Sequence, residues 1–406
     1  MISTQRRLSV ALLGLLLAVL AACRESAPAG AAEEYTGFEN QSAPKQALVA
    51  GQTEDPRLRG ISLPPGFRIE LYAENVTSAR CLKLSPDGTL FVGSRGTDHV
   101  YALRDTDGDF VADEQFTIGS GLRMPVGVEF RDGDLYVAEV SRVWRYDGIE
   151  SRLANPPDPV LIERYPSDEH HGWKYIRFGP DGRLYVPVGA PCNVCTRDNP
   201  IYASITSIGP DGGGRQIVAQ GVRNTVGFDW NPLNGELWFT DNGRDMLGDN
   251  MPPDELNRIP AGSAVDGAAP HFGFPFYHAG EIKDPEFSEG KGRDAYIAPM
   301  QKLGPHVAAL GVRFNTGSMF PQEYQNQLFI AEHGSWNRSS KIGYRVMLVR
   351  LDADGSAASY EPFAEGWLDG NGKVSGRPVA IEFLPDGSML LSDDYANCIY
   401  RISYGG

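Results

Sequence analysis

The sequence predicts an all-β fold, a six-bladed β-propeller. The first observation is a strand signature of the form Asp-Gly-x-Leu-aromatic-Val, which occurs in six related copies along the chain. The second is the composition, because 47 glycines, 29 prolines and 10% aromatic residues are typical of many short strands joined by turns. The third is that no strong helical periodicity occurs beyond the N-terminal apolar run.

The six copies share a tight turn followed by an apolar strand. Asp-Gly or Asn-Gly supplies the positive φ that such a turn requires, and the apolar run is typical of a strand buried on both faces. Another strand is expected before each turn, for example at 81–85 and 174–178. The central residues of the six copies are Leu90, Leu135, Leu184, Leu237, Leu328 and Met389.

The spacing of the copies indicates the size of the repeating unit. The first three intervals are 45, 49 and 53 residues, close to the roughly 40–50 residues of a four-stranded blade. The fourth interval of 91 residues holds a Gly- and Pro-rich insertion, which we place at about Met251 to Pro305. One of the flanking strands, 67–72 or 399–402, is expected to close the ring by pairing with the blade at the other terminus. A sandwich of unrelated hairpins, the alternative, does not explain six similar copies.

The N-terminus has the features of an export signal. Two arginines precede an apolar run of about 13 residues, which is too short to span a bilayer comfortably. The run ends in Leu-Ala-Ala-Cys23, which resembles a bacterial lipoprotein box with an acylated cysteine; the alternative is ordinary signal cleavage nearby. We therefore predict a signal peptide at 1–22, a flexible tether at 23–58 and the propeller at 59–406. The expected location is the periplasmic face of a bacterial outer membrane.

The charge of the chain limits its partners. A net charge of −15 argues against nucleic acid or an anionic membrane surface as the main partner. It is consistent with a protein that handles neutral or cationic small molecules. Contact with a membrane is expected only through the lipid anchor at Cys23.

Four cysteines remain after the signal, at positions 81, 192, 195 and 398. An even number in an oxidising compartment suggests disulfides, and Cys192-Asn-Val-Cys195 is close enough to form a local loop. A zinc site would need two further ligands, and no second cysteine pair is near in sequence. A redox role lacks the surrounding βαβ pattern. We predict a disulfide at Cys192 and Cys195.

Three polar clusters stand out against the repeats. In a propeller, the loops that lead into the innermost strands and those between blades converge on one end of the central channel, so polar residues there are candidates for a site. The first cluster is 169–172. The second combines 221–230, 237–244 and 252–257, and the third is 329–338.

These motifs resemble those of the quinoprotein sugar dehydrogenases, the family of soluble glucose dehydrogenase, aldose sugar dehydrogenases and sorbosone dehydrogenases. The resemblance covers about residues 60–406. The matching motifs lie in the three clusters and before the last repeat: His171 eight residues before Gly179-Pro-Asp-Gly, Gly-x-Arg223-Asn224, Thr-Asp-Asn-Gly243 leading to Pro-Asp-Glu-Leu-Asn257, Glu-His-Gly-Ser-Trp-Asn-Arg338 and Gly-Arg377-Pro. The last two are similar to the sorbosone branch especially.

The resemblance implies a propeller that binds pyrroloquinoline quinone (PQQ) and calcium at the channel mouth. It implies oxidation of the anomeric hydroxyl of a sugar to a lactone, or of an aldehyde to an acid. His171 matches the general base that removes the substrate proton, and an imidazole suits this role. Arg223 matches the arginine beside the reactive quinone oxygens, and Asn224 matches its cofactor-contacting neighbour.

The remaining candidates hold the metal and the cofactor. Gly243 and Arg244 match the positions whose backbone carbonyls bind calcium. The cofactor is a tricarboxylate, so its pocket needs cations, and Arg377 is the first candidate. Arg338, with Trp336 for ring contact, is the second; the alternative for Arg338 is a surface or barrel-bracing arginine.

The chain departs from the soluble glucose dehydrogenase pattern at three positions. The aspartate that orients the general base there is His170 here, the calcium-loop proline is Arg244, and only Arg377 stands where that enzyme has two closely spaced arginines. These differences favour the sorbosone or aldose branch. They leave open a propeller that has lost its cofactor.

A separate acidic segment lies between the first and second copies of the repeat. Asp105, Asp107, Asp109 and Asp113 alternate around a glycine and resemble an isolated calcium loop. The segment lacks the full EF-hand length and flanking helices. It is either a structural calcium site or an acidic turn between blade strands, and we assign it no catalytic role.

Two other functions compete with a dehydrogenase. A calcium-dependent propeller lactonase or hydrolase would also place a metal at the channel mouth, but the cationic Arg223 and Arg377 favour an anionic cofactor. A non-catalytic binding propeller would not need His171 in register with the dehydrogenase motifs. The expected substrate is a sugar or an aldehyde. Since no haem-attachment Cys-x-x-Cys-His motif occurs, electrons are expected to pass to a periplasmic acceptor.

Overall fold

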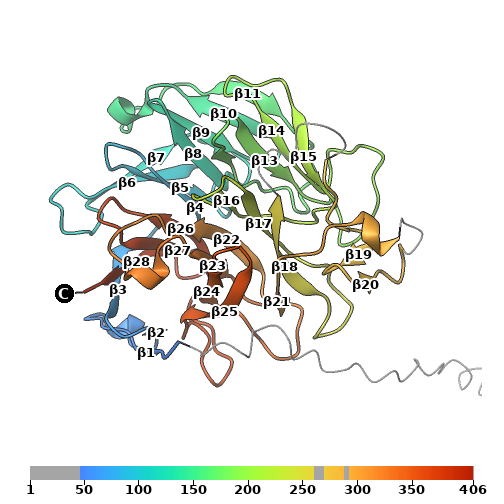
Figure 1. Ribbon diagram of the computed structural model, residues 1–406. Coiled ribbons are helices and arrows are strands. Elements are labelled where there is room, and N and C mark those ends of the chain that lie inside the picture. Colours follow the sequence, from blue (N-terminus) through green and yellow to red (C-terminus); the bar gives the residue numbers. More distant parts are fainter. Residues whose placement is uncertain (1–45, 260–268, 288–291, 406) are drawn as a thin grey trace, which may run out of the picture. The chain divides into compact units, whose positions relative to one another are not determined.

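The structure, a computed structural model, describes residues 46–259, 269–287 and 292–405. Within these ranges it contains six four-stranded antiparallel sheets, two small two-stranded sheets and four short 3-10 helices (Figure 1). The six larger sheets are the blades of a β-propeller, which confirms the predicted fold class. No helix of the described ranges is long and apolar enough to cross a membrane. The predicted signal peptide and Cys23 lie outside the described residues.

The first three blades each use four consecutive strands, which run in chain order from the innermost to the outermost. Blade 1 comprises β4 (Ala79–Leu84), β5 (Leu90–Ser94), β6 (Val100–Arg104) and β7 (Glu114–Ile118). Blade 2 comprises β8 (Gly127–Arg131), β9 (Asp134–Ala138), β10 (Arg142–Tyr146) and β11 (Val160–Arg164), with the 3-10 helix η2 (Ile149–Arg152) before β11. Blade 3 comprises β12 (Arg177–Phe178), β13 (Leu184–Val188), β14 (Ser204–Ile208) and β15 (Gln216–Gln220).

The last three blades contain the irregularities of the ring. Blade 4 comprises β16 (Phe228–Trp230), β17 (Leu237–Asp241), β18 (Pro253–Ile259) and β21 (Gln301–Pro305). Blade 5 comprises β22 (Ala309–Phe314), β23 (Leu328–Glu332), β24 (Arg345–Leu351) and β25 (Ala357–Ala364), with η4 (Gln322–Tyr324) before β23. Blade 6 comprises β26 (Pro378–Phe383), β27 (Met389–Asp393), β28 (Cys398–Tyr404) and β3 (Phe67–Ala73).

The repeated signature forms the turn between the first and second strands of each blade. Gly88 has a φ of 89° in the first copy, a conformation that glycine adopts without steric penalty. In the fifth copy Asn326, with a φ of 58°, takes this place, because asparagine tolerates the left-handed region. The second strand is buried along its whole length in blades 1, 4, 5 and 6, as its apolar composition predicts. Between blades the side chains interlock, and Phe91 stacks on Phe130 with ring centroids 5.6 Å apart.

The ring closes by pairing an N-terminal strand with the last C-terminal strand. β3 pairs antiparallel to β28, with Ile69 opposite Ile402, and so becomes the outermost strand of blade 6. Both isoleucines are fully buried. The predicted closure is therefore confirmed, and it is the N-terminal strand that joins the blade at the other terminus.

The segment before β3 is folded, which corrects the predicted tether boundary at residue 58. β1 (Val49–Ala50) pairs with β2 (Ser62–Leu63), and η1 (Pro56–Leu58) buries Leu58 in the core. The backbone N–H of Gln46 donates to Glu361 of blade 5 at 3.1 Å. The polar composition misled the prediction, because a few apolar side chains are enough to hold the segment against the propeller.

The insertion in the fourth interval is shorter than predicted. β18 and β21, which lie inside the predicted range of Met251 to Pro305, are the two outer strands of blade 4. The insertion therefore falls between them, at 260–300, and contains β19 (Tyr277–His278), β20 (Ile282–Lys283) and η3 (Arg293–Ala295) among the described residues. The strand composition of β18, Pro-Asp-Glu-Leu-Asn, hid it from a search for apolar runs.

A ring of charged side chains, which we call the charge ring, lies near the turn end of the inner strands. Each inner strand contributes one member, and along the blades the charges alternate: Lys83, Glu129, Arg177, Asp229, Arg313 and Glu382. Lys83 Nζ lies 2.5 Å from Glu129 Oε1, and Asp229 lies between Arg177 at 3.4 Å and Arg313 at 3.5 Å. Arg313 also pairs with Glu382. The charge ring thus links blades 1 and 2 and blades 3 to 6 by ion pairs.

Candidate active site

A cavity of about 800 Å³ lies at the end of the channel where the inner strands begin. Residues just before or at the start of all six inner strands contribute to it, and residues after β5, β17 and β23 complete the wall. The lining residues are Arg80, Arg95, Met124, Glu169, His170, His171, Trp173, Arg223, Asn224, Asn242, Gly243, Asp245, Asp254, His306, Ala308, Leu310, His333, Gly334, Trp336 and Arg377. The three polar clusters predicted from the sequence therefore meet in one cavity.

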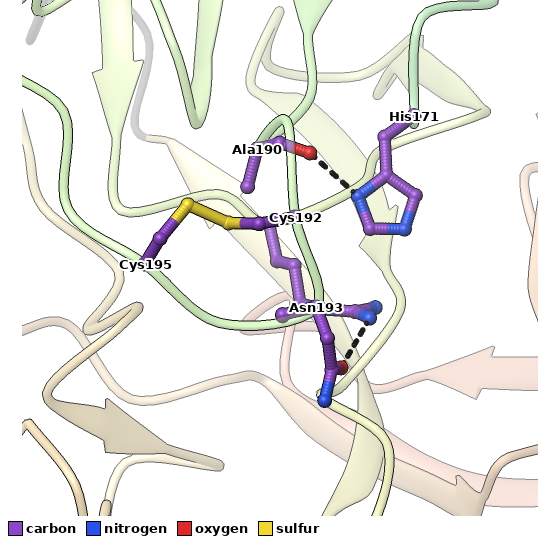
Figure 2. Close-up of a disulfide and its surroundings, with 6 residues drawn as sticks. His171, Ala190, Cys192, Asn193 and Cys195 are labelled. Atoms are coloured by element: carbon purple, nitrogen blue, oxygen red, sulfur yellow. Dashed lines mark hydrogen bonds between the residues drawn. A yellow bond between two sulfur atoms is a disulfide. The ribbon is translucent and has the colours of Figure 1, made fainter. Parts of the chain in front are cut away.

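His171, the predicted general base, lines this cavity ahead of β12. Its side chain is buried, and its Nδ1 lies 2.9 Å from the carbonyl oxygen of Ala190 (Figure 2). Because a carbonyl only accepts, Nδ1 carries the proton and Nε2 of the neutral ring keeps its lone pair. Burial, with a smaller contribution from Arg223, lowers the pKa of His171 well below its usual value. His171 thus presents a neutral imidazole with an unprotonated nitrogen at the cavity.

The backbone around His171 forms a tight turn that presents the ring. His171 has a φ of 51°, in the left-handed region that histidine adopts only occasionally. The next residue, Gly172, packs so closely that a Cβ there would lie 2.2 Å from the carbonyl oxygen of Asp168. Nζ of the buried Lys174 donates to the Gly172 carbonyl at 2.8 Å and holds the turn. Gly172, which follows His171, is therefore a structural requirement of this turn.

Arg223 is buried in the wall and fixed by hydrogen bonds through all of its nitrogens. Its Nε donates to the carbonyl of Asn193 at 2.8 Å, and Nη1 donates to the carbonyls of Asn242 at 3.1 Å and Gly243 at 2.7 Å. Nη2 donates to Asn193 Oδ1 at 2.9 Å and pairs with Asp245 at 3.0 Å. A guanidinium held in this way is a preorganised positive charge that can stabilise negative charge developing at the cavity.

Two buried carboxylates hold the backbone on which these residues stand. Asp241 accepts the backbone N–H groups of Arg223 and Asn224 at 2.8 and 2.6 Å. Asp254 accepts those of Gly243 and Ala308, both at 2.8 Å. Burial raises the pKa of Asp241 to about 8 and that of Asp254 to about 7. The Asp-Asn-Gly and Pro-Asp-Glu motifs thus fix the site through their aspartates.

The predicted disulfide between Cys192 and Cys195 is present. It closes the loop that carries Asn193, between Ala190 and the rest of the connection to β14 (Figure 2). Cys81 and Cys398 are free and buried, so the suggestion that all four cysteines form disulfides is wrong for this pair. Each is one of the small apolar residues of its own strand.

Three arginines line the cavity in addition to Arg223. Arg377 donates to the carbonyls of His333 at 3.0 Å and Gly334 at 2.8 Å. Arg80 pairs with Asp394 at 2.8 Å, but its buried Nε has no hydrogen-bond partner within the described part of the chain. Arg95 lies with its guanidinium 4.2 Å above the ring of Trp173.

The cations outweigh the acids at this cavity. Burial and then the charge of Arg80 lower the pKa of Arg95, which shows that the guanidinium groups repel one another. Of the acidic lining residues, Asp245 pairs with Arg223, Asp254 accepts backbone N–H groups, and Glu169 pairs with Arg123 at the rim. An orphaned buried Nε among clustered arginines fits a ligand with several carboxylates, as PQQ has.

The two residues predicted to hold calcium differ in their place, because Arg244 is not among the residues that line the cavity. Gly243 lines the cavity, and its carbonyl accepts from Arg223 through one of its two lone pairs. The Arg244 side chain turns away and pairs with Asp284 at 2.6 Å and Glu286 at 2.8 Å. Carbonyl and carboxylate oxygens are the donors that calcium prefers, so the chemistry of this wall fits a hard cation.

Trp336 and Arg338 separate in the structure. Trp336 lines the cavity and is 68% exposed, so it can cover a flat ligand. Arg338 does not line the cavity; it donates to the carbonyls of Ser340 at 3.0 Å and Asp249. The structure thus places Arg338 outside the cavity lining, where its contacts match the alternative, an arginine that braces loops.

The acidic segment lies on the exposed β6–β7 connection and not at the cavity. Oxygens of Asp105, Asp107 and Asp109 lie within 4.8 Å of one another. Asp113 instead accepts from both the backbone N–H and the hydroxyl of Thr106 at 2.7 Å. Three of the four predicted carboxylates are therefore grouped, and a calcium ion there stays a prediction.

Arg80, Arg95 and Trp173 are lining residues that sequence reasoning missed. None belongs to a motif of the resemblance. Arg80 is the second residue of β4, and Arg95 directly follows β5, positions equivalent to those of other lining residues. The repeat itself was the signal that could have found them, if each blade had been searched for polar residues at these two places.

Comparison with known proteins gives one family match and relatives that cover most of the chain. Residues 211–404 match the TrAA12-like family. The chain is 34% identical over 359 residues to an uncharacterized protein of Borreliella burgdorferi, covering 85% of this chain and 91% of that protein. It is 22% identical over 401 residues to a PQQ-dependent pyranose dehydrogenase of Coprinopsis cinerea, covering 83% of this chain. The chain spans about half, 54%, of the length of that fungal enzyme.

Solved structures share the fold. The PQQ domain of the Coprinopsis cinerea pyranose dehydrogenase, in its holo form, has a TM-score of 0.70 at 17% identity and covers 89% of this chain and 99% of its own. A calcium structure of the Trichoderma reesei enzyme of carbohydrate-active family AA12 has a TM-score of 0.72 at 17% identity, covering 90% and 99%. From the family match, the motifs and these relatives, the chain belongs with the TrAA12-like proteins and is similar to PQQ-dependent sugar dehydrogenases.

Proposed function

We propose that the protein is a PQQ- and calcium-dependent dehydrogenase that oxidises an aldose or a sugar aldehyde in the cavity. The observation that carries the proposal is that one cavity is lined by both a neutral buried His171 and four arginines, although the net charge of the chain is −15. An anionic cofactor explains the arginines, and a proton acceptor explains His171. The related fungal enzyme, named as a PQQ-dependent pyranose dehydrogenase, supports the same class of reaction.

In this proposal Arg80, Arg95 and Arg377 bind the carboxylates of PQQ. Arg80 and Arg95 both belong to blade 1 and Arg377 directly precedes blade 6, so the three guanidinium groups come from two neighbouring blades. Trp336 lies against the flat ring system. When bound, PQQ supplies the electrophilic carbonyl that accepts hydride from the substrate C–H bond.

His171 and Arg223 act on the substrate side. Nε2 of His171 accepts the proton of the substrate hydroxyl, which is the anomeric hydroxyl of an aldose or a hydroxyl of the hydrated aldehyde, while the Nδ1–H bond to Ala190 keeps the ring in one tautomer and orientation. Arg223 stabilises the negative charge that develops at the reacting oxygen, since its position is fixed before the substrate binds.

We also propose that calcium binds beside the carbonyl of Gly243. The free lone pair of this carbonyl and the nearby carboxylate of Asp245 provide hard oxygen donors. The calcium structure of the related Trichoderma reesei enzyme supports this proposal. A contribution of the Arg244 carbonyl follows from the resemblance alone.

The test is reconstitution of the metal-stripped protein. Isothermal titration calorimetry with PQQ, with and without Ca²⁺, measures binding, and a dye acceptor measures oxidation of a panel of aldoses and aldehydes. Arg377→Gln should weaken PQQ binding by about tenfold or more, as expected for a lost charged hydrogen-bonding partner. Arg338→Gln is the matched control and should bind normally, because Arg338 lies outside the cavity. Absence of PQQ binding to the unmodified protein would overturn the proposal.

Export, lipid anchoring at Cys23 and a periplasmic electron acceptor belong to the same proposal. A dehydrogenase that holds its cofactor must pass electrons on, and an anchored enzyme would meet an acceptor at the membrane. Labelled palmitate should be incorporated into the full chain and not into Cys23→Ser. Equal labelling of both would contradict the anchor.

A further inference from the structure

One short loop contacts both residues that the proposed function assigns to the chemistry. It runs from Ala190 to Cys195, after β13, and its last four residues are closed by the Cys192–Cys195 disulfide (Figure 2). The Ala190 carbonyl accepts from Nδ1 of His171, and Ala190 N–H in turn donates to the Arg223 carbonyl at 2.8 Å. The loop therefore joins His171 to Arg223 from outside the cavity.

Asn193, inside the disulfide loop, uses its polar groups to hold Arg223 and its partner. Its backbone carbonyl accepts from Arg223 Nε at 2.8 Å, and its Oδ1 accepts from Arg223 Nη2 at 2.9 Å. The same Oδ1 accepts from the N–H of Asp245 at 2.8 Å, and Nδ2 donates to the Asp245 carbonyl at 3.1 Å. Asn193 thus links the guanidinium to the loop after β17 through both its backbone and its side chain.

A free loop of this kind would not hold a guanidinium in one place. The segment has no strand or helix of its own, and its residues from 191 to 195 are only half-buried. Closing a short ring removes many of the conformations that the chain could otherwise adopt. Within the described part of the chain this is the one disulfide, and it falls at the loop that carries Asn193. Preorganised charges work because they do not reorganise during the reaction.

We infer that the Cys192–Cys195 loop is a positioning device, in which the disulfide fixes Asn193 and Asn193 fixes Arg223 at the cavity wall. The inference rests on the proposed function for its effect on turnover. Its structural part, the restraint of Arg223, does not depend on any cofactor. Asn193 and the two cysteines act through Arg223 and do not line the cavity.

The first test uses the cofactor-free protein. The Nε–H group of Arg223 is observed by ¹⁵N NMR, assigned from its loss in Arg223→Lys, and its exchange with solvent is measured. Exchange should be slow in the unmodified protein and at least about tenfold faster in the double variant Cys192→Ser/Cys195→Ser, because the loop opens more often. Val194→Ala, in the same loop with the disulfide and Asn193 intact, is the matched control and should exchange slowly. Unchanged exchange in the double variant would overturn the inference.

A pair of variants at Asn193 separates its acceptor from its size. Asn193→Asp keeps an oxygen acceptor for Arg223, whereas Asn193→Leu has similar volume and none. In reconstituted enzyme, Leu should lower kcat by about a hundredfold with little change of KM, as expected when a fixed charge is lost from the transition state. Asp should retain most of kcat. Equal loss in both, with melting curves like that of the unmodified protein, would contradict positioning through the acceptor.

The two tests fail differently. If the protein does not bind PQQ, the proposed function fails while the exchange measurement still decides whether the loop restrains Arg223. If PQQ binds and turnover is normal in the double cysteine variant, the proposed function stands and the positioning role is wrong.

Discussion

At the residue scale, His171, which we propose as the general base, is oriented without an aspartate beside it. The neighbouring residue is His170, and the orienting group is the backbone carbonyl of Ala190. A carbonyl fixes the tautomer as a carboxylate would, but it adds no negative charge that would favour the imidazolium. The base is therefore neutral, and it stays neutral at lower pH than an ordinary histidine.

Replacing His171 by asparagine should remove most of the turnover and leave PQQ binding intact. Asparagine tolerates the left-handed backbone at this position, so the turn should survive. We expect kcat to fall by about 10²–10⁴, the usual contribution of a general base. Retention of full activity by His171→Asn would show that another group accepts the proton.

The pH profile of the unmodified enzyme should follow the lowered pKa of His171. Burial is the largest cause of the lowered pKa, and the charges of the facing groups Arg223, His170 and Arg95 lower it further. The basic form is thus present down to a pH below 6.5, the ordinary histidine value. In kcat/KM, the acid limb assigned to His171 should lie below that pH, and a limb at or above it would contradict the assignment.

The buried Lys174 should make stability depend on pH in the alkaline range. Burial lowers the pKa of Lys174 from 10.5 to about 7, so between these values the unfolded chain binds a proton that the folded chain does not. The free energy of unfolding should therefore rise as the pH rises from about 7 to 10, by up to about 1.4 kcal/mol per pH unit from this group. In urea titrations, Lys174→Met should show a smaller slope. An equal slope would mean that the lysine stays protonated.

At the element scale, the loops that begin the inner strands carry the site, and this is where sequence reasoning succeeded and failed. His171, Arg223 and Arg377 were predicted because they stand in motifs, and all three line the cavity. Arg80 was missed because a single arginine at a strand start has no local signature; only the ring brings it to the others. The fold itself was predictable, since turn chemistry and spacing repeat six times. The ends of the tether and of the insertion were not predictable, because short polar strands contain too few apolar residues to be recognised in the sequence.

Removal of β3 should open the ring, whereas removal of the chain before residue 46 should not. β3 covers the edge of β28, and an uncovered edge with buried isoleucines invites aggregation. A chain starting at residue 46 should therefore melt like the full chain and elute as a folded monomer or its native oligomer. A chain starting at residue 74 should be aggregated or unfolded by circular dichroism and size-exclusion chromatography. Cooperative melting of the shorter chain would contradict this role of β3.

At the scale of the whole molecule, the two ends of the channel differ in charge. The cavity end gathers arginines in a chain that is acidic as a whole, so its local charge is opposite in sign to the net charge of the protein. The turn end carries the charge ring, whose members neutralise one another in pairs. The end that lines the cavity and the end that links the blades are thus built from the same strands.

The charge ring predicts a non-additive mutant cycle. Arg313→Met should destabilise the protein by about 3–5 kcal/mol, because it leaves Glu382 without its partner in a buried setting. Arg313→Met combined with Glu382→Met should recover most of this loss, since replacing both partners of a buried pair is often near neutral. Urea unfolding of the two single variants and the double variant measures the coupling. Additive effects would show that the pair contributes nothing specific.

The alternation in the charge ring also constrains how such a molecule can change in evolution. Charges of alternating sign in a closed ring give every member a neighbour of opposite charge on both sides only when the number of members is even. Loss or duplication of one blade would bring two like charges side by side at the seam, which destabilises a close contact in a partly buried setting. Gain or loss of blades in pairs would preserve the match. The six blades observed here satisfy this condition, whereas five or seven would not.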